Sequence, residues 1–589
     1  MSALTQTDKP LHAWVRALER TAPYADDSGP TLPAIVADAA IAFGERPALL
    51  SDGGDLSYGQ LAGRMAQYAR WTLAHGVRTG DVVGLMLPNC ADYVAIWLGT
   101  TAVGGVVALI NPNLAGDALL HALSAVATRH LIVGSEFHAA VADISDRLSG
   151  ITIWSVGDGT SWLKLDAEIA KLSSGPLQAH EQRPPALRDL ALHIYTSGTT
   201  GLPKAANVSH RRIAEWCGWF AGLIDVRPDD RMYNCLPMSH SVGGVVAIGA
   251  MFFGGGSVLI RPKFSATRFW DDVADGDCTL FQYIGELCRY LVNTPPHPRE
   301  TAHRLRLCCG NGLRGDVWGA FKDRFAIPRI LEFYAATEGN VSLYNVDGRP
   351  GAIGRVPGFL AHRFPIALVQ CDPATRVLAR DENGLCIRCG RDEPGEALGR
   401  ISSDAGRPFE GYADVDASEA KVARNVAAAG DAWFRTGDLM RRDAAGFYYF
   451  VDRLGDTFRW KGENVATEQV AETLRDCPGV TEAVVYGVVV AGNEGRAGMA
   501  ALTVGPAFDL ATFRSHAGAR LADYARPVFL RLMHAIPVTG TFKPAAAMLA
   551  TEGYDPDTVA DPLYIDDRTQ AAYVPLDRGL HARIGTLRI

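Results

Sequence analysis

Short apolar, β-branched runs alternate with helical patterns over most of the first 350 positions. The runs at 81–87, 190–196 and 256–260 each have the length and composition of a buried strand. Strands that alternate with helices favour largely parallel sheets covered by helices. This part of the chain is therefore predicted to have α/β architecture.

From residue 351 to about 450 the pattern changes to short strands and turns, as in "GLCIRCG" and "GFYYFVDR". This pattern predicts a small antiparallel sheet or barrel. Beyond residue 456, two helical patterns and the apolar run "EAVVYGVVV" are typical of a compact α+β unit. A chain of 589 residues is too long for one hydrophobic core, so at least two domains are expected.

One uncharged apolar run, at 94–110, has the composition of a membrane span. It is shorter than the roughly 20 residues of a membrane-spanning helix, it contains Gly104 and Gly105, and no Lys/Arg cluster flanks it. A buried helix, a turn at the glycines and a buried strand explain the run at least as well. We favour this buried interpretation, and the N-terminal sequence predicts neither a signal peptide nor an anchor.

The composition is that of an ordinary globular protein, with 48% hydrophobic and 21% charged residues. The net charge of −8 argues against a nucleic-acid partner. Eleven cysteines show no disulfide-framework spacing, which indicates reduced thiols and a cytoplasmic location. The "CIRC" at 386–389 has redox or zinc spacing, but its alternation favours buried strand cysteines.

The stretch "YTSGTTGLPK" combines glycines, hydroxyl side chains and a lysine directly after a buried strand. Glycines let the backbone approach an anion closely, and N–H groups and hydroxyls donate to it. A Walker A loop needs its lysine directly after the last glycine, but Leu202 and Pro203 intervene here and Ala205 follows. The loop is therefore predicted to bind phosphate without kinase or GTPase chemistry. Its assigned residues are Tyr195, Thr196, Ser197, Gly198, Thr199, Thr200, Gly201 and Lys204.

Five further motifs follow in order: "LPMSHSVGG" at 236–244, "YAATEGN" at 334–340, "FRTGDL" at 434–439, "VDRLGDTFRWKGENV" at 451–465 and "VTGTFKP" at 538–544. With the phosphate loop, they resemble the signature motifs of the adenylate-forming superfamily, which includes acyl-CoA synthetases, luciferases and peptide-synthetase adenylation domains. "FYAATEGN", "TGTFKP" and the late "DPLYIDDRTQAAYVPLD" resemble its fatty acid transport protein, or very-long-chain acyl-CoA synthetase, branch.

The resemblance implies an α/β protein with a large N-terminal domain, made of two α/β subdomains plus a small β-barrel, joined by a hinge to a smaller α+β C-terminal domain. We expect the ATP- and fatty-acid-binding domain at 1–452, the hinge at 453–456, the mobile C-terminal domain at 457–555 and a tail at 556–589. Gly455 occupies the pivot, where glycine tolerates a large backbone change.

The resemblance also implies a two-step reaction with ATP, Mg²⁺ and coenzyme A. A fatty carboxylate attacks the α-phosphorus of ATP to give acyl-AMP and pyrophosphate, and the thiol of coenzyme A then displaces AMP. The carboxylate is already ionised, so the first step requires no general base. Its difficulty is the approach of two anions, which cations and aligned dipoles relieve.

In "YAATEGN", the resemblance assigns Thr337 to a phosphate contact, Glu338 to Mg²⁺ and Tyr334 to stacking on adenine. Taken alone, the motif would be read as a buried tyrosine before a helix-capping Thr-Glu pair. The "GNG" at 310–312 occupies the place of a further adenine-side loop. His240 matches a position beside the acyl and phosphate junction, with a structural histidine as the alternative.

The resemblance gives the later motifs ribose, phosphate and coenzyme A roles. Asp438 would accept hydrogen bonds from the ribose hydroxyls, since a carboxylate is acceptor-only. Arg453 would reach the ribose and phosphate side, and Lys543 would bridge the carboxylate and the α-phosphate. Lys461 and Gly462 are expected to face the pantetheine channel. Taken alone, Asp438 and Arg453 would more often form a surface ion pair.

The leading hypothesis is a long- or very-long-chain acyl-CoA synthetase that couples transport only by trapping its product as a thioester. A fatty acid transporter and an enzyme that passes acyl-AMP to a carrier protein are the alternatives. The helix at 211–220, with Trp216, Trp219 and Phe220, is a candidate for lining the acyl tunnel, and core packing explains it equally well. Peripheral contact with the inner membrane surface and a homodimer are compatible with the sequence.

Overall fold

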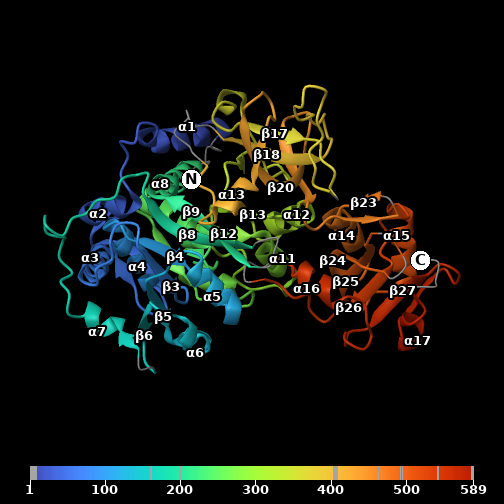
Figure 1. Cartoon of the computed structure of the whole chain (residues 1–589), viewed down its shortest axis with the longest axis horizontal. Helices are drawn as coiled ribbons and strands as arrows, with labels where there is room; N and C mark the ends of the chain where they lie inside the picture. Colours follow the sequence, from blue (N-terminus) through green and yellow to red (C-terminus); the bar gives the residue numbers. More distant parts are fainter. Residues whose placement is uncertain are drawn as a thin grey trace. The chain divides into compact units, whose positions relative to one another are not determined.

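The computed structural model describes residues 9–584 apart from 160–161, 198–201, 374, 402–408, 462, 491–492, 494 and 540–542 (Figure 1). The chain divides into two compact units. The first contains residues 1–357 and 401–422, and the second contains residues 358–400 and 423–589. The predicted hinge at 453–456 lies inside the second unit.

Within the described residues, one sheet of the first unit has the order β7-β6-β5-β3-β4-β8-β9. All its neighbouring strands are parallel except the β8–β9 pair. The strands are β3 Val82–Met86, β4 Val106–Leu109, β5 His130–Gly134, β6 Thr152–Val156, β7 Leu163–Lys164, β8 Leu190–Ser197 and β9 Pro203–Ser209. Both β3 and β4 are buried along their whole length, as parallel strands covered on two faces should be. The predicted α/β architecture is confirmed here.

The apolar run at 94–110 forms a buried helix, a turn and a buried strand. Its first residues belong to α4 (Ala91–Ala102), where the side chains of Trp97 and Leu98 are fully buried. Gly104 then turns with a φ of +89°, and β4 follows. The buried interpretation of this run is confirmed. No helix in the described part of the chain is long and apolar enough to cross a bilayer.

The second sheet of this unit has the order β16-β15-β14-β13-β12-β10-β11-β1-β2. Its strands are β1 Pro47–Ser51, β2 Leu56–Ser57, β10 Arg231–Asn234, β11 Ser257–Ile260, β12 Leu280–Ile284, β13 Leu307–Asn311, β14 Ile330–Ala335, β15 Ser342–Asn345 and β16 Gly354–Arg355. The neighbours from β14 to β1 are parallel, whereas β2, β15 and β16 pair in the antiparallel sense. Parallel strands end at one edge, so the segments after β12, β13 and β14 meet there. This edge carries the predicted adenine-side loop at 310–312 and the "YAATEGN" motif at 334–340, here called the acidic motif.

The helices of the first unit begin at local capping signals. The Ser57 side chain accepts from the N–H of Gln60, whose side chain accepts in turn from the N–H of Ser57, and α3 follows this capping box. Ser209 likewise accepts from the N–H of Arg212 at the start of α8. The helices are α1 Pro10–Thr21, α2 Leu32–Phe43, α3 Tyr58–Ala74, α5 Gly116–Ser124, α6 His138–Ala142, α7 Leu165–Ile169, α8 His210–Leu223, α9 Ala247–Phe252, α10 Phe269–Asp275, α11 Gly285–Asn293, α12 Gly315–Arg324 and α13 Val415–Glu419, besides α4.

The strands expected between residues 351 and 450 form a sheet in the second unit, and its first and last neighbouring pairs, β17–β18 and β20–β21, are antiparallel. Their hydrogen-bonded order is β17-β18-β20-β21, with β19 beside β20. They are β17 Ile366–Val369, β18 Gly395–Ile401, β19 Val422–Arg424, β20 Ala432–Arg442 and β21 Phe447–Arg453. A barrel requires its two edge strands to pair with each other. Among the described residues no such pair closes this sheet, so the structure differs from the implied β-barrel.

One of the two "CIRC" cysteines, Cys386, belongs to the core of this sheet. Cys386 is buried with Val369, Leu398 and Trp433, and Cys389 is half-buried. Both are free thiols. The predicted burial is confirmed for Cys386, whereas Cys389 is only partly buried, and neither residue lies in a named strand: Cys386 forms only an isolated bridge with Arg380.

The rest of the second unit contains a β22–β23 hairpin and a sheet with the order β24-β25-β26-β27-β28. The strands are β22 Phe458–Trp460, β23 Glu463–Val465, β24 Val480–Val488, β25 Ala497–Val504, β26 Phe529–Leu532, β27 Leu563–Asp567 and β28 Ala572–Pro575, and the helices are α14 Thr467–Arg475, α15 Leu510–Arg520, α16 Ala546–Glu552 and α17 Arg578–His581. The predicted tail from residue 556 supplies β27 and β28 of this sheet. The α+β character expected beyond residue 456 is confirmed.

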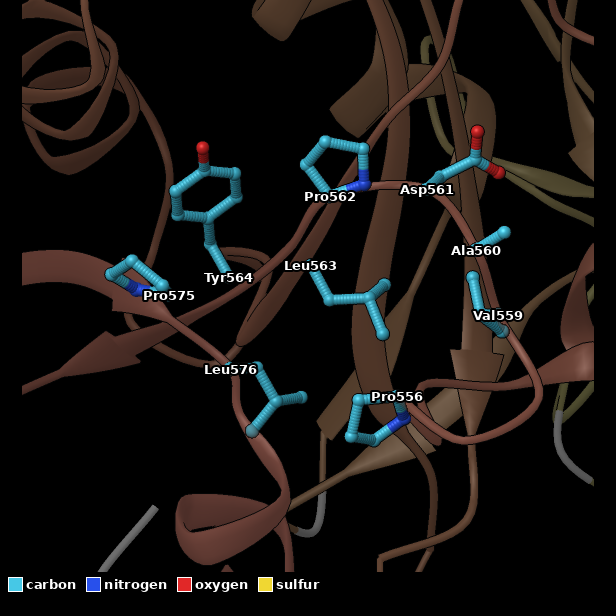
Figure 2. Close-up of a pocket in the computed structure, with 9 residues that line it drawn as sticks. All are labelled: Pro556, Val559, Ala560, Asp561, Pro562, Leu563, Tyr564, Pro575 and Leu576. Carbon is cyan, nitrogen blue, oxygen red and sulfur yellow. The ribbon is translucent and has the colours of Figure 1, made fainter.

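A pocket lies beside β27 and β28 (Figure 2). It is lined by Pro556, Val559, Ala560, Asp561, Pro562, Leu563, Tyr564, Pro575 and Leu576. Three of these side chains, those of Val559, Leu563 and Leu576, are buried in the core of the C-terminal sheet. None of the predicted nucleotide, metal or coenzyme A residues is in this lining.

Candidate active site

Three distant segments of the first unit hold the turn at 337–339 that follows β14. The hydroxyl oxygens of Thr337 and Ser241 lie 3.1 Å apart. Glu338 Oε1 accepts a hydrogen bond of 2.8 Å from the phenol of Tyr412. The buried guanidinium of Arg212 donates to the carbonyl oxygen of Gly339. The predicted phosphate and metal residues are therefore fixed by contacts that the motif itself does not contain.

Tyr412 also contacts the phosphate loop. Lys204 Nζ lies 5.8 Å from the centre of the Tyr412 ring, and Ala206 of the same strand is opposite Tyr412. Burial and the neighbouring Glu338 raise the pKa of this phenol, so it keeps its proton and acts as a donor. Through Tyr412, the structure brings together predicted residues from two separate motifs.

The described part of the phosphate loop consists of the ends of β8 and β9. Thr196 is paired with Lys204, and Ser197 with Pro203, in the antiparallel register. Tyr195 is buried, and its phenol donates 2.5 Å to the carbonyl oxygen of Ala122. The Tyr195 side chain thus belongs to the core, which leaves only its backbone for the predicted nucleotide contact. The predicted residues Gly198, Thr199, Thr200, Gly201 and Gly462 lie outside the described residues.

The "GNG" loop is closely packed where β13 ends. A Cβ atom at Gly310 would lie 2.2 Å from the carbonyl oxygen of Tyr283, and one at Gly285 would lie 1.8 Å from that of Gly312. Gly312 has a φ of +80°, which favours glycine. The loop therefore approaches its neighbours more closely than any side chain would allow.

A buried carboxyl group supports this loop. Glu332 is 1% exposed and lies on β14, two residues before the predicted adenine-stacking Tyr334. Its Oε2 accepts from the Tyr283 phenol at 2.6 Å, and its Oε1 accepts from the N–H of Leu313 at 3.1 Å. Burial raises the pKa of Glu332 to about 8. Sequence reasoning missed this residue, although an acidic residue inside the apolar strand "ILEFYA" was a signal for it.

His240 lies two residues before a π-helical turn, Val242–Val246. Its N–H donates to the carbonyl oxygen of Pro237 at 3.2 Å, and its carbonyl oxygen accepts from the N–H of Gly244 at 2.8 Å. Because the next residue, Ser241, contacts Thr337, His240 is on the segment that reaches the acidic motif. Single π-helical turns in proteins often occur at functional sites.

The candidate acyl-tunnel side chains divide into two groups. Trp219 and Phe220 are buried and contact aromatic rings, Trp219 with Tyr344 and Phe220 with Phe333. Trp216 is half-buried, and the Arg212 guanidinium lies 5.1 Å from its ring. Core packing therefore explains Trp219 and Phe220. Trp216 instead contacts Arg212, which donates to Gly339 of the acidic motif.

The second unit brings the predicted ribose and lysine residues into one electrostatic cluster. Asp438 and Arg453 face each other across β20 and β21, with 3.4 Å between Arg453 Nε and Asp438 Oδ1. The pKa of Asp456 is raised, mainly by burial. The neighbouring carboxylate of Asp438 also raises it, whereas the cations Arg453 and Lys543 lower it. Lys543 is exposed, and its N–H donates to Thr539 Oγ1 at 3.2 Å.

The start of α14 is held by a residue that precedes the predicted hinge. Asp452 is buried at the end of β21, and its carboxylate accepts from the N–H and the hydroxyl of Thr467. Burial raises the pKa of Asp452 to about 7.

The predicted coenzyme A residue Lys461 contacts two side chains. Its Nζ lies 4.0 Å from Asp523 and 5.8 Å from the Trp460 ring, and burial lowers the pKa of Lys461.

Comparison with known proteins decides the family. The model of the AMP-binding enzyme family matches residues 36–390, and that of the AMP-binding enzyme C-terminal domain matches residues 469–543. Long-chain fatty acid transport protein 1 of Mus musculus is 41% identical over 566 residues, which are 95% of this chain and 88% of that protein. The chain belongs to the AMP-binding enzyme family. Within this adenylate-forming family it lies in the fatty acid transport protein branch.

Solved structures of AMP-binding enzymes have the same fold. ATP-bound MatB from Rhodopseudomonas palustris has a TM-score of 0.74 at 23% identity, over 88% of this chain and 98% of that one. The Mycobacterium tuberculosis fatty acyl CoA synthetase has a TM-score of 0.64 at 22% identity, over 89% of this chain and 98% of that one. The large α/β N-terminal part and the smaller C-terminal part are thus those of adenylate-forming enzymes.

The donor atoms at the 337–339 turn of this AMP-binding enzyme fit a hard cation. The Glu338 carboxylate and the hydroxyls of Thr337 and Ser241 are all oxygen ligands. Mg²⁺ prefers such ligands and is usually bound through one or two carboxylates together with substrate phosphates. The residues present therefore suit a magnesium–nucleotide complex.

The pKa of Glu332 predicts a pH-dependent stability. The folded protein retains this proton up to about pH 8, whereas a glutamate in the unfolded chain releases it near 4.5. Between these values the folded state binds more protons, so the contribution is present at acidic pH and is lost as the pH rises through about 8. Glu332→Gln keeps a neutral group there, so its melting temperature should fall less than that of wild type from pH 5.5 to 8.5. An equal fall in melting temperature for the variant and wild type over this pH range would contradict the prediction.

Proposed function

We propose that this protein is an ATP- and Mg²⁺-dependent long- or very-long-chain acyl-CoA synthetase. It forms acyl-AMP and pyrophosphate from a fatty acid and ATP, and then acyl-CoA and AMP from acyl-AMP and coenzyme A. The observation that carries the proposal is the contact of Tyr412 with both motifs: its phenol donates a 2.8 Å hydrogen bond to Glu338, and its ring lies 5.8 Å from Lys204 Nζ of the phosphate loop. The similarity to a long-chain fatty acid transport protein supports the substrate class.

In the first step, the chain's own groups reduce the repulsion between two anions. Lys204 and the backbone of the phosphate loop would bind the phosphates, and Thr337 would orient them by hydrogen bonding. Glu338 would hold Mg²⁺, which supplies positive charge to the phosphate oxygens when bound. Lys543 would lie between the carboxylate and the α-phosphate. No residue is needed to remove a proton, because the carboxylate is ionised.

The other assigned residues bind the nucleoside and release the product. Tyr334, supported through β14 by Glu332, would stack on adenine, and Asp438 would accept from the ribose hydroxyls. Lys461 belongs to the face that would receive coenzyme A in the second step. Conversion to the thioester traps the fatty acid inside the cell, which is the only coupling to transport in this proposal.

A pyrophosphate-release screen tests the proposal. Purified protein is given ATP, Mg²⁺ and carboxylic acids of graded chain length, with and without coenzyme A. We expect release to depend on acid and to be highest for long chains, with AMP and acyl-CoA as final products only when coenzyme A is present. Release with short or aromatic acids alone would contradict the substrate class, and transfer only to a phosphopantetheinyl carrier protein would contradict the second step.

A further inference from the structure

Tyr412 is fixed in place by the strand that carries Lys204. The N–H of Asn207, on β9, donates a hydrogen bond of 2.9 Å to the carbonyl oxygen of Gly411. The N–H of Ala413 donates one of 2.8 Å to the carbonyl oxygen of Ala205. These bonds align the backbone around Tyr412 antiparallel to β9, with Ala206 opposite Tyr412. The position of the Tyr412 ring therefore follows from the same strand that ends the phosphate loop.

The segment is held from its other side as well. The N–H of Tyr412 donates 2.8 Å to Ser418 Oγ, and Gly411 adopts a φ of +62°. Glu410 accepts from both the N–H and the hydroxyl of Ser209, at 2.7 Å each. With its backbone bonded on two sides and only 6% of its surface exposed, Tyr412 has little freedom to move independently of β9.

The phenol of Tyr412 acts on Glu338, a residue 74 positions away in the chain. A glutamate side chain has several rotatable bonds and, left unheld, samples many rotamers. The 2.8 Å bond from Tyr412 engages Oε1, so Oε2 is the oxygen that would face a cation. A tyrosine whose ring position is set by the phosphate-loop strand thus selects where that oxygen lies relative to the phosphates.

We propose that Tyr412 is a positioning residue that orients the Glu338 carboxylate for the magnesium–ATP complex. The inference rests on the proposed function, because it assumes that ATP is bound at this site. Partners that orient a metal-binding side chain without contacting the metal are worth roughly 10- to 100-fold in metal affinity. Tyr412 would supply this orientation through its hydrogen bond to Glu338.

The test measures ATP binding by calorimetry across a Mg²⁺ titration, without fatty acid or coenzyme A. Tyr412→Phe keeps the ring beneath Lys204 and removes only the hydroxyl. We expect its half-maximal Mg²⁺ concentration to rise roughly 10-fold, while ATP binding at saturating Mg²⁺ changes much less. Tyr412→His retains a ring N–H donor and should give a midpoint between those of wild type and Tyr412→Phe.

Tyr58→Phe is the matched control. Tyr58 is also buried in the first unit, and its hydroxyl donates 2.6 Å to the carbonyl oxygen of Gly256, away from the motif residues. It should leave the Mg²⁺ midpoint unchanged. If wild type binds ATP with Mg²⁺ and the Tyr412 variants have its midpoint, the inference alone is overturned. If wild type shows no Mg²⁺-dependent ATP binding, the proposed function fails and the inference fails with it.

Discussion

Replacing Lys543 by alanine should severely slow acyl-AMP formation and spare the conversion of supplied acyl-AMP into acyl-CoA. In the first step the carboxylate and the α-phosphate approach as two anions, so a cation placed between them stabilises the transition state more than the ground state. Loss of one such electrostatic group typically lowers kcat by roughly 100- to 1000-fold. In the second step a neutral thioester replaces the acyl phosphate, so the same cation matters less.

The charge of Lys543 acts on Asp456, a residue of the predicted hinge. Lys543 lowers the pKa of this carboxyl group, as Arg453 does, whereas Asp438 raises it. The Lys543 backbone is anchored to Thr539 by two bonds, of 3.2 Å from Lys543 N to Thr539 Oγ1 and of 2.7 Å from Thr539 N to Lys543 O. An exposed lysine whose backbone is anchored in this way can present its ammonium group to a ligand.

Two assays separate the steps. ATP–pyrophosphate exchange with a fatty acid reports adenylation, and thioester formation from synthetic acyl-AMP reports the second step alone. Lys322→Ala, which removes an exposed lysine from the last turn of α12, is the control and should match wild type in both assays. Equal losses in both assays for Lys543→Ala would exclude the bridging role.

Features that depend on local sequence were predictable. The run at 94–110 reads as helix, turn and strand because its glycines interrupt a stretch too short for a membrane span, and the structure has that order. The period-2 alternation around Cys386 likewise indicated a core position. In both cases neighbouring residues alone determine the conformation.

The contacts that hold the site were not predictable, because sheet assembly creates them. Arg212 reaches Gly339 across 127 positions, and Tyr412 reaches Glu338 across 74, and no sequence period records such a pairing. Tyr195 shows the same limit inside a motif. The strand it belongs to is buried on both faces, so alternation could not reveal that its side chain lies in the core.

The most damaging substitution that we predict outside the charged residues is Gly244→Ala. Gly244 lies in the π-helical turn that follows Ser241, and a Cβ atom there would lie 1.8 Å from the carbonyl oxygen of Met238. A backbone oxygen cannot move away by a rotamer change, so the chain itself would have to shift. Overpacking of this kind should cost about 3 kcal/mol of stability. It should also weaken ATP binding, because the same turn places Ser241 against Thr337.

Gly319→Ala separates this clash from the general effect of adding a methyl group to a helical glycine. Gly319 lies inside α12, is exposed, and has no atom within 4 Å of a Cβ atom built there. Alanine favours the helix over glycine, so this variant should gain up to about 1 kcal/mol. Urea unfolding followed by tryptophan fluorescence compares the two. If Gly244→Ala unfolds at the wild-type urea concentration, the turn can relax, and the tight packing around Gly244 does not fix the position of Ser241.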